Sequence, residues 1–278
     1  MLISISLIAY ILSTCPLIHS LTLEKPKSQY YSFTNRFGEH KIRYTTADLT
    51  EQKTTTGPPV LFIHGFGGNA DQFRYNIPAV AKAGYKTFAI DLLGYGFSDK
   101  PNPKAYGVNE VYNFENWAEQ VAYFIDEVVK EPCVLVCNSV GGCVGLQAGI
   151  TRPDVVKGIV LMNISLRLLH KKKQNPMMRP FVASLQYILR ESGIGNTFFN
   201  QVATPRTLKA ILSSAYASET DVTDEIVDII LQPGLDPRAV NVFLDFISYS
   251  GGPLPEEQLE QLSAAMKVCV FMYVCMYV

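Results

Sequence analysis

The sequence has little charge, and neither sign predominates. Asp, Glu, Lys and Arg make up 18% of its 278 residues and leave a net charge of −1 at pH 7. Proteins that bind nucleic acid concentrate basic side chains to neutralise phosphates, so this balance argues against a nucleic-acid partner. Repeats and low-complexity segments are absent as well. The remaining class is a globular protein, 48% apolar, whose length allows one large core with an inserted subdomain.

Cysteine is sparse, and its spacing excludes the usual cysteine-based frameworks. The six cysteines are Cys15, Cys133, Cys137, Cys143, Cys269 and Cys275. They show no metal-type spacing and stand mostly within apolar runs, so we expect buried free thiols and no disulfide framework. We expect neither a metal site nor a cofactor.

The amino terminus carries no charge until Glu24. Residues 1–29 form an atypical apolar segment, and Pro16 and His19 break its apolar run, which is short for a spanning helix. Its composition fits a secretory leader or a membrane anchor, although it lacks basic residues before the run and a small-residue cleavage site. The alternative is an atypical start to the chain.

From residue 30 onward, apolar residues follow the periods of strands and helices. A turn at Asn35 to Gly38 predicts a hairpin of amphipathic strands. Buried strands are expected at residues 58–65, 86–92, 133–138 and 156–164, and helices at residues 70–84, 113–130 and 140–151. Asn113 is the expected N-cap of the second helix. This alternation predicts the α/β class, with a mostly parallel, doubly wound sheet between two layers of helices.

The segment VLVCNSVGGCVGL places Ser139 between a predicted strand and a predicted helix. A strand-to-helix turn at the carboxyl edge of a parallel sheet lifts its side chain into the crevice where ligands bind. The turn needs small residues two positions before and after the serine, where Cys137 and Gly141 stand. Glycine is usual at the first position, so Cys137 departs slightly from the nucleophile-elbow pattern. We predict a nucleophilic Ser139, and the alternative is an ordinary strand-helix junction.

A glycine-rich stretch, HGFGGNADQF, follows the first buried strand and begins at His64. Acyl transfer needs two backbone N–H donors that converge on the developing oxyanion. We assign these donors to Phe66, on this stretch, and to Val140, which follows the serine. The glycines that permit close approach of the backbone are Gly65, Gly67 and Gly68. His64 is either a catalytic base or a side chain that braces this loop, and its place within the loop favours bracing.

Three motifs in order, HGFGG, DLLGYGFSDKP and CNSVGG, resemble the α/β-hydrolase superfamily in its cap-bearing branch, which includes epoxide hydrolases and esterases. Longer segments resemble the plant plastid α/β-hydrolases related to pheophytinase, among them RYNIPAVAKAGYKTFAIDLLGYGFSDKPNP, NISLRLLH and FLDFISYSGGPLPEE. The resemblance covers roughly residues 30–267. It implies a serine hydrolase of carboxylic esters, with Ser139 as nucleophile and Asp91 as a structural anchor of its loop. It also implies a chloroplast location, and the apolar amino terminus suggests the secretory pathway instead.

The family pattern divides the chain into an α/β core and a cap. The segments are 1–29, the atypical amino terminus; 30–164, the core; 165–250, a helical cap; and 251–278, a return to the core. A cap excludes water and lines an apolar pocket, so the expected partner is a small ester with a bulky apolar part. The basic run from His170 to Lys173 has two interpretations, a solvated face or a grip on an acidic substrate or a membrane surface, and the first is favoured.

The partners that Ser139 needs cannot be found in the sequence. In this superfamily the order is serine, acid and histidine, with the acid after a late strand. The late strand here is KVCVFMYV from Lys267, and no Gly-x-x-Asp turn or histidine follows it. An earlier position used by some relatives holds Asn163, which is not a carboxylate.

Histidine occurs four times, at His19, His40, His64 and His170. A serine hydroxyl without a base is a poor nucleophile. We therefore expect a carboxyl-terminally truncated hydrolase, inactive or feebly active. Two alternatives stay open: a non-catalytic protein that binds an apolar ligand, and a secreted or membrane-anchored interaction protein.

Overall fold

A seven-stranded sheet forms the centre of the computed structural model, which describes residues 25–47, 57–215, 222–262, 264 and 266–271. The strands are β1 Lys27–Asn35, β2 Gly38–Thr46, β3 Val60–Ile63, β4 Thr87–Ile90, β5 Cys133–Asn138, β6 Val156–Met162 and β7 Val268–Phe271. Their order in the sheet is β1-β2-β4-β3-β5-β6-β7. The pairs β1–β2 and β2–β4 are antiparallel, and all other neighbours are parallel. The expected hairpin and the mostly parallel sheet are confirmed.

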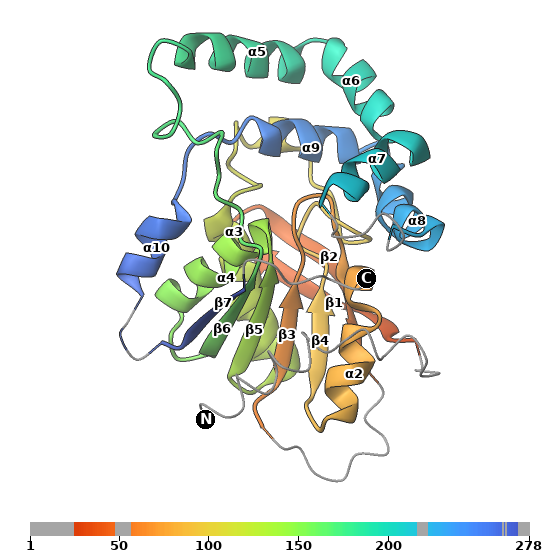
Figure 1. Ribbon diagram of the computed structural model, residues 1–278, viewed down its shortest axis with the longest axis vertical. Coiled ribbons are helices and arrows are strands. Elements are labelled where there is room, and N and C mark those ends of the chain that lie inside the picture. The colour runs from red at the N-terminus through yellow and green to blue at the C-terminus, as the bar shows by residue number, and fades with distance from the viewer. Residues whose placement is uncertain (1–24, 48–56, 216–221, 263, 265, 272–278) are drawn as a thin grey trace.

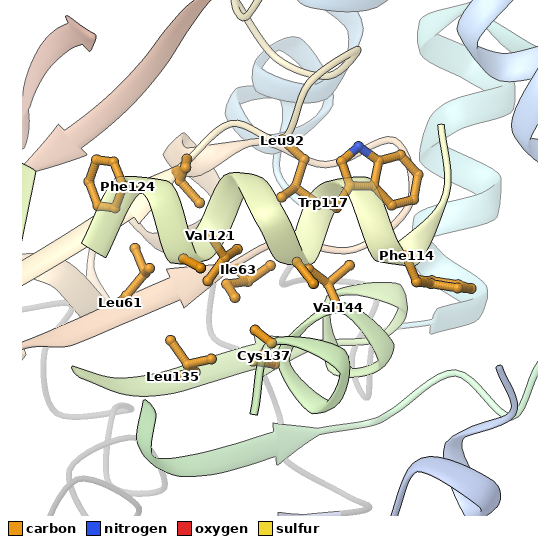
Figure 2. Close-up of a cluster of buried hydrophobic side chains, with 14 of the residues drawn as sticks. Leu61, Ile63, Leu92, Phe114, Trp117, Val121, Phe124, Leu135, Cys137 and Val144 are labelled. Atoms are coloured by element: carbon orange, nitrogen blue, oxygen red, sulfur yellow. The ribbon is translucent and has the colours of Figure 1, made fainter. Parts of the chain in front are cut away.

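Alternate residues of each central strand face opposite layers of helices, as the period of a strand requires. Leu61 and Ile63 pack in one apolar cluster with Trp117 and Val121 of helix α3 (Phe114–Phe124), which Figure 2 shows above the strands. Val60 and Phe62 pack on the other face, in a cluster that includes Ile77 of helix α2 (Asn76–Lys82). Both faces of the sheet are therefore covered, as the α/β prediction required.

Two of the three expected helices are interrupted. The first is split into a short 3-10 helix, η2 (Ala70–Phe73), and α2, and the backbone N–H of Ala70 at the start of η2 donates to the Asp91 carboxylate. The second begins at the expected N-cap Asn113, and after α3 it continues as one π-helical turn, η4 (Ile125–Val129). The third, α4 (Val140–Thr151), has the expected bounds.

Five helices are described between β6 and α10 (Pro255–Gln261), in a segment of which residues 216–221 are not described, and we call them the inserted helices. They are α5 Arg179–Glu191, α6 Ile194–Val202, α7 Pro205–Ala215, α8 Asp224–Gly234 and α9 Ala239–Ile247. Figure 1 shows them beyond the ends to which the parallel strands point, with α5 and α6 farthest from the sheet and α8 and α9 nearer to it. The chain then returns through α10, where the Gln258 side chain donates to the Cys143 carbonyl of α4, and adds β7.

Several expectations concern the ends of the chain. The apolar residues 1–24 and the residues after Phe271 lie outside the described residues. Cys133, Cys137 and Cys143 are buried free thiols, as expected, and Cys269 is a free thiol that is only partly buried. Cys15 and Cys275 lie outside the described residues. None of the described helices has both the length and the apolarity needed to cross a membrane.

Candidate active site

Ser139 stands at the turn between β5 and α4 with φ +51° and ψ −116°. A positive φ is uncommon outside glycine, and such strain concentrates at functional sites. Backbone hydrogen bonds fix this conformation: Ser139 N–H donates to Met162 O at 3.0 Å, and Ser139 O accepts from Gly142 and Ser165 at 3.0 and 3.1 Å. The strained turn is therefore tied both to β6 and to the segment that leads to the inserted helices.

Small residues surround the turn because other atoms occupy the space of a side chain. A Cβ at Gly141 would lie 2.5 Å from His64 O. A Cβ at Gly145, one turn further along α4, would lie 2.4 Å from Cys137 Sγ. The departure at Cys137 is thus accommodated by a glycine on the following helix. Burial raises the pKa of the Cys137 thiol, so this cysteine does not offer a reactive thiolate.

The glycine-rich loop after β3 lies directly against the serine. A Cβ at Gly65 would lie 2.9 Å from Ser139 Cβ. Gly67 has φ +72°, and Gly68 N–H donates to Gly65 O at 3.1 Å, which closes a tight turn. Val140 opens α4, so its amide is one of those at a helix start that have no partner within the helix. The structure thus brings the predicted loop and the predicted turn into contact.

The side chain of Phe66 joins this loop to the inserted helices. Its ring centroid lies 5.5 Å from that of Phe243 and 5.3 Å from that of Phe246, both on α9. Asn69 Nδ2 also donates to Ile229 O of α8 at 2.7 Å. A cavity of about 70 Å³ lies beside Phe66, and residues lining it include Tyr95, Phe199 and Phe243. Apolar and aromatic side chains form most of the lining of this cavity.

His64 is fully buried, and both of its ring nitrogens are engaged by the backbone. Nε2 accepts from Leu92 N–H at 3.0 Å, so Nδ1 carries the proton and donates to Gly65 O at 2.7 Å. Burial lowers the pKa of His64, although Asp91 acts in the opposite direction. A neutral imidazole held in this way braces the loop between β3 and η2, and it has no free nitrogen to accept a proton from Ser139.

His170 is also buried and bound by the backbone. Its Nε2 donates to Gly252 O at 3.0 Å, and its Nδ1 accepts from Lys172 N–H at 3.1 Å. His170 connects the residues before the inserted helices to the residues after them. Arg167 makes the same connection, because its guanidinium donates to the carbonyls of Tyr249, Gly251 and Pro253. Among the described residues, no side chain accepts a hydrogen bond from Ser139 Oγ.

Asp91 anchors the loop that follows β4, as the resemblance implied. Its carboxylate is fully buried and accepts from Ala70 N–H at 2.6 Å, Phe97 N–H at 2.8 Å and Arg43 Nη1 at 3.3 Å. These bonds connect β2, the glycine-rich loop and the loop at residues 91–101. The acid therefore holds the backbone that carries Phe66.

Asp245, on α9, is a residue whose position the sequence pattern did not reveal. It is buried where α9 meets the core, and Oδ1 accepts from Asn109 N–H at 3.1 Å. Burial raises the pKa of Asp245 to about 6, and Oδ2 has no hydrogen-bond partner among the described residues. The available signal was one acid within the apolar segment AVNVFLDFI. The part of the chain that the structure describes contains no cluster of acidic, histidine and cysteine residues able to hold a metal ion.

Comparison with known proteins identifies relatives among the hydrolases of this fold. The family model described as alpha/beta hydrolase fold matches residues 58–225. Pheophytinase, chloroplastic, of Arabidopsis thaliana is 25% identical over 230 residues, which cover 71% of this chain and 46% of that protein, so the chain spans about half the length of this relative. AB hydrolase superfamily protein YisY of Bacillus subtilis (strain 168) is 26% identical over 219 residues, with 76% of this chain and 71% of that protein covered.

Solved structures of epoxide hydrolases have a similar fold. The epoxide hydrolase CorEH superposes with a TM-score of 0.64 at 15% identity, covering 88% of this chain and 81% of that one. Epoxide hydrolase VrEH1 of Vigna radiata gives a TM-score of 0.59 at 19% identity, covering 87% and 79%.

Proposed function

The chain belongs to the α/β-hydrolase fold family, and from this premise we propose that it is a serine hydrolase of carboxylic esters. The observation that carries the proposal is the strained turn at Ser139, packed against the glycine-rich loop. In the proposed reaction Ser139 Oγ attacks the ester carbonyl carbon, the alcohol leaves, and water then hydrolyses the acyl-serine. The serine must lose its proton as it attacks.

The proposed oxyanion hole consists of the amides of Phe66 and Val140. Support comes from the contact between Gly65 and Ser139, which brings the loop carrying Phe66 next to the helix start at Val140. Loss of one such donor typically lowers the rate about 10²- to 10³-fold. The bonds of His64 and Asp91 hold this loop in place, so we assign both a positioning role.

The proposed substrate is a small ester with a bulky apolar part, and we propose that the inserted helices act as a lid. The aromatic contacts between Phe66 and α9 and the apolar lining of the adjacent cavity support this assignment. Similarity to a chloroplastic relative supports residence in the chloroplast as part of the same proposal.

We further propose that these 278 residues alone turn over esters slowly. No histidine follows His170 in the sequence, and the ring nitrogens of His64 and His170 are bound to the backbone. Loss of the triad histidine of subtilisin lowers turnover about 10⁶-fold, which corresponds to about 8 kcal/mol of activation free energy.

The lack of a free histidine for Ser139 among the described residues also favours a second candidate function. In this candidate the protein is not catalytic and binds an apolar ligand in the cavity beside Phe66. Two measurements separate the candidates: hydrolysis of a long-chain p-nitrophenyl ester, and binding of the matching ether, which cannot be hydrolysed. We expect slow hydrolysis by the present chain and much faster, Ser139-dependent hydrolysis when an added late strand supplies an acid and a histidine. Saturable ether binding without hydrolysis in either form would favour the binding protein.

A further inference from the structure

Helix α5 and the segment that leads into it expose an unusual amount of apolar side chain. Met177 is 84% exposed, Phe181 76% and Leu168 73%. The outer apolar surface, as we use the term, consists of Met177, Phe181, Leu185 and Ile188, on α5 and directly before it. Figure 1 shows that α5, which carries three of them, lies in the layer farthest from the sheet. Exposed apolar patches of this kind mark interaction surfaces.

Helix α5 has its polar contacts on the inner side and its apolar residues on the outer side. Gln186 Nε2 donates to Ile247 O of α9 at 3.1 Å and to Ser250 Oγ at 3.0 Å, which fixes the inner side. Phe181, Leu185 and Ile188 recur at the spacing of one helical face and are all exposed. An outer helix of a soluble protein ordinarily places polar residues there.

The charged residues of the segment that carries this surface have one sign. Residues 165–190 contain six Lys and Arg and no Asp or Glu, whereas the whole chain has 24 basic and 25 acidic residues. Lys171 and Arg179 form no ion pair with any described residue. Lys172 and Lys173 pair with Glu257 and Glu256 in exposed ion pairs, which are weak and easily exchanged.

We propose that the outer apolar surface docks on an anionic lipid bilayer, with Lys171 and Arg179 at the lipid headgroups. Helices that lie in a membrane interface combine large apolar residues with Lys and Arg in this way. A second copy of the chain fits less well, because pairing two such surfaces would bring their like charges together. The proposal concerns recruitment to a surface and does not depend on the chemistry of Ser139.

Vesicle flotation tests the proposal with the full chain. The vesicles contain phosphatidylcholine alone or phosphatidylcholine mixed with phosphatidylglycerol, at low and at high salt. We expect binding to the anionic vesicles that weakens as salt rises. Lys171→Gln with Arg179→Gln should weaken it about thirtyfold, or about fivefold for each cation. Phe181→Gln with Leu185→Gln should weaken it more than about tenfold.

Two matched variants serve as controls. Leu235→Gln changes a side chain that is 57% exposed, compared with 54% for Leu185, and Lys157→Gln removes an exposed cation of β6. Neither should change vesicle binding. Circular dichroism and light scattering check that every variant is folded, and report its oligomeric state.

Three results would overturn the proposal. The first is no binding to either kind of vesicle. The second is binding that both double variants retain, which would assign it to another part of the chain. The third is a wild-type chain that forms a dimer and does not bind vesicles, where Phe181→Gln with Leu185→Gln dissociates the dimer. The outer apolar surface would then be a contact between two copies of the chain.

Discussion

A methyl group added at Gly145 would collide with a single atom, Cys137 Sγ. The Cβ position lies 2.4 Å from that sulfur, whereas its next neighbours, Cys137 Cβ and Ile159 Cγ2, lie at 3.6 and 3.7 Å. Contacts at these longer distances are ordinary van der Waals contacts. Gly145→Ala should therefore destabilise the fold through the sulfur alone, and removal of the sulfur should relieve the effect.

The expected magnitudes follow from packing and helix propensity. Overpacking of a core typically costs about 1–3 kcal/mol, and alanine in a helix interior is about 1 kcal/mol more favourable than glycine. Gly145→Ala alone should lower the free energy of unfolding by up to about 2 kcal/mol. In a Cys137→Ala background the same change should be neutral or stabilising, which gives a favourable coupling energy of about 1–3 kcal/mol.

Urea unfolding of the four chains in this double-mutant cycle measures the coupling, provided that the slope m stays constant. Gly141→Ala is the matched control, because its Cβ would meet His64 O at 2.5 Å and Ile63 O at 2.6 Å. Backbone atoms cause that clash, so Cys137→Ala should not rescue it. Additive effects of Cys137→Ala and Gly145→Ala would refute the packing described for the turn.

Three further changes should alter stability in predictable ways. Asn113→Ala removes the side chain that accepts from Asn116 N–H at the start of α3, and it should lower the free energy of unfolding by about 1 kcal/mol in urea; no change would show that the cap is unimportant. Asp91→Ala leaves Arg43 Nη1 and two backbone N–H groups without their acceptor, and it should lower the free energy of unfolding by about 3–5 kcal/mol, measured as a lower thermal midpoint. Burial raises the pKa of Asp245 from 3.8 to about 6, so the folded chain binds this proton more tightly than the unfolded chain. The resulting stability, up to about 3 kcal/mol, is complete below about pH 4 and is lost as the pH rises through about 6. The stability of the wild-type chain relative to Asp245→Asn should therefore fall over that range, and a difference independent of pH would contradict the assignment.

The sheet and its helix layers could be predicted because their signals are local. The apolar runs before His64 and Ser139 correspond to β3 and β5, and Asn113 caps α3 as its sequence context indicates. The expected helix at residues 70–84 is divided into η2 and α2, and the amide of Ala70 at its start donates to Asp91, which is distant in sequence. A tertiary hydrogen bond of this kind has no signature in the periodicity of the segment.

The candidate site was predictable only in its central elements. The spacing of small residues around Ser139 indicated a tight turn, but the space above Gly145 that receives Cys137 Sγ depends on how α4 crosses β5. The bond of His64 to Leu92 joins two loops, and the burial of Asp245 depends on how α9 meets the core. These properties arise from contacts between segments far apart in the chain, which local sequence does not specify.

The most direct test of the account is the rate at which the 278-residue chain hydrolyses an activated p-nitrophenyl ester, compared with Ser139→Ala and His170→Ala. Among the described residues no side chain accepts a hydrogen bond from Ser139 Oγ, and His64 and His170 are bound to the backbone through both ring nitrogens. The account predicts slow hydrolysis that Ser139→Ala changes only a few-fold, since the oxyanion donors act without the hydroxyl. Fast, saturable hydrolysis that is lost in both Ser139→Ala and His170→Ala would contradict it, because His170 would then supply the base.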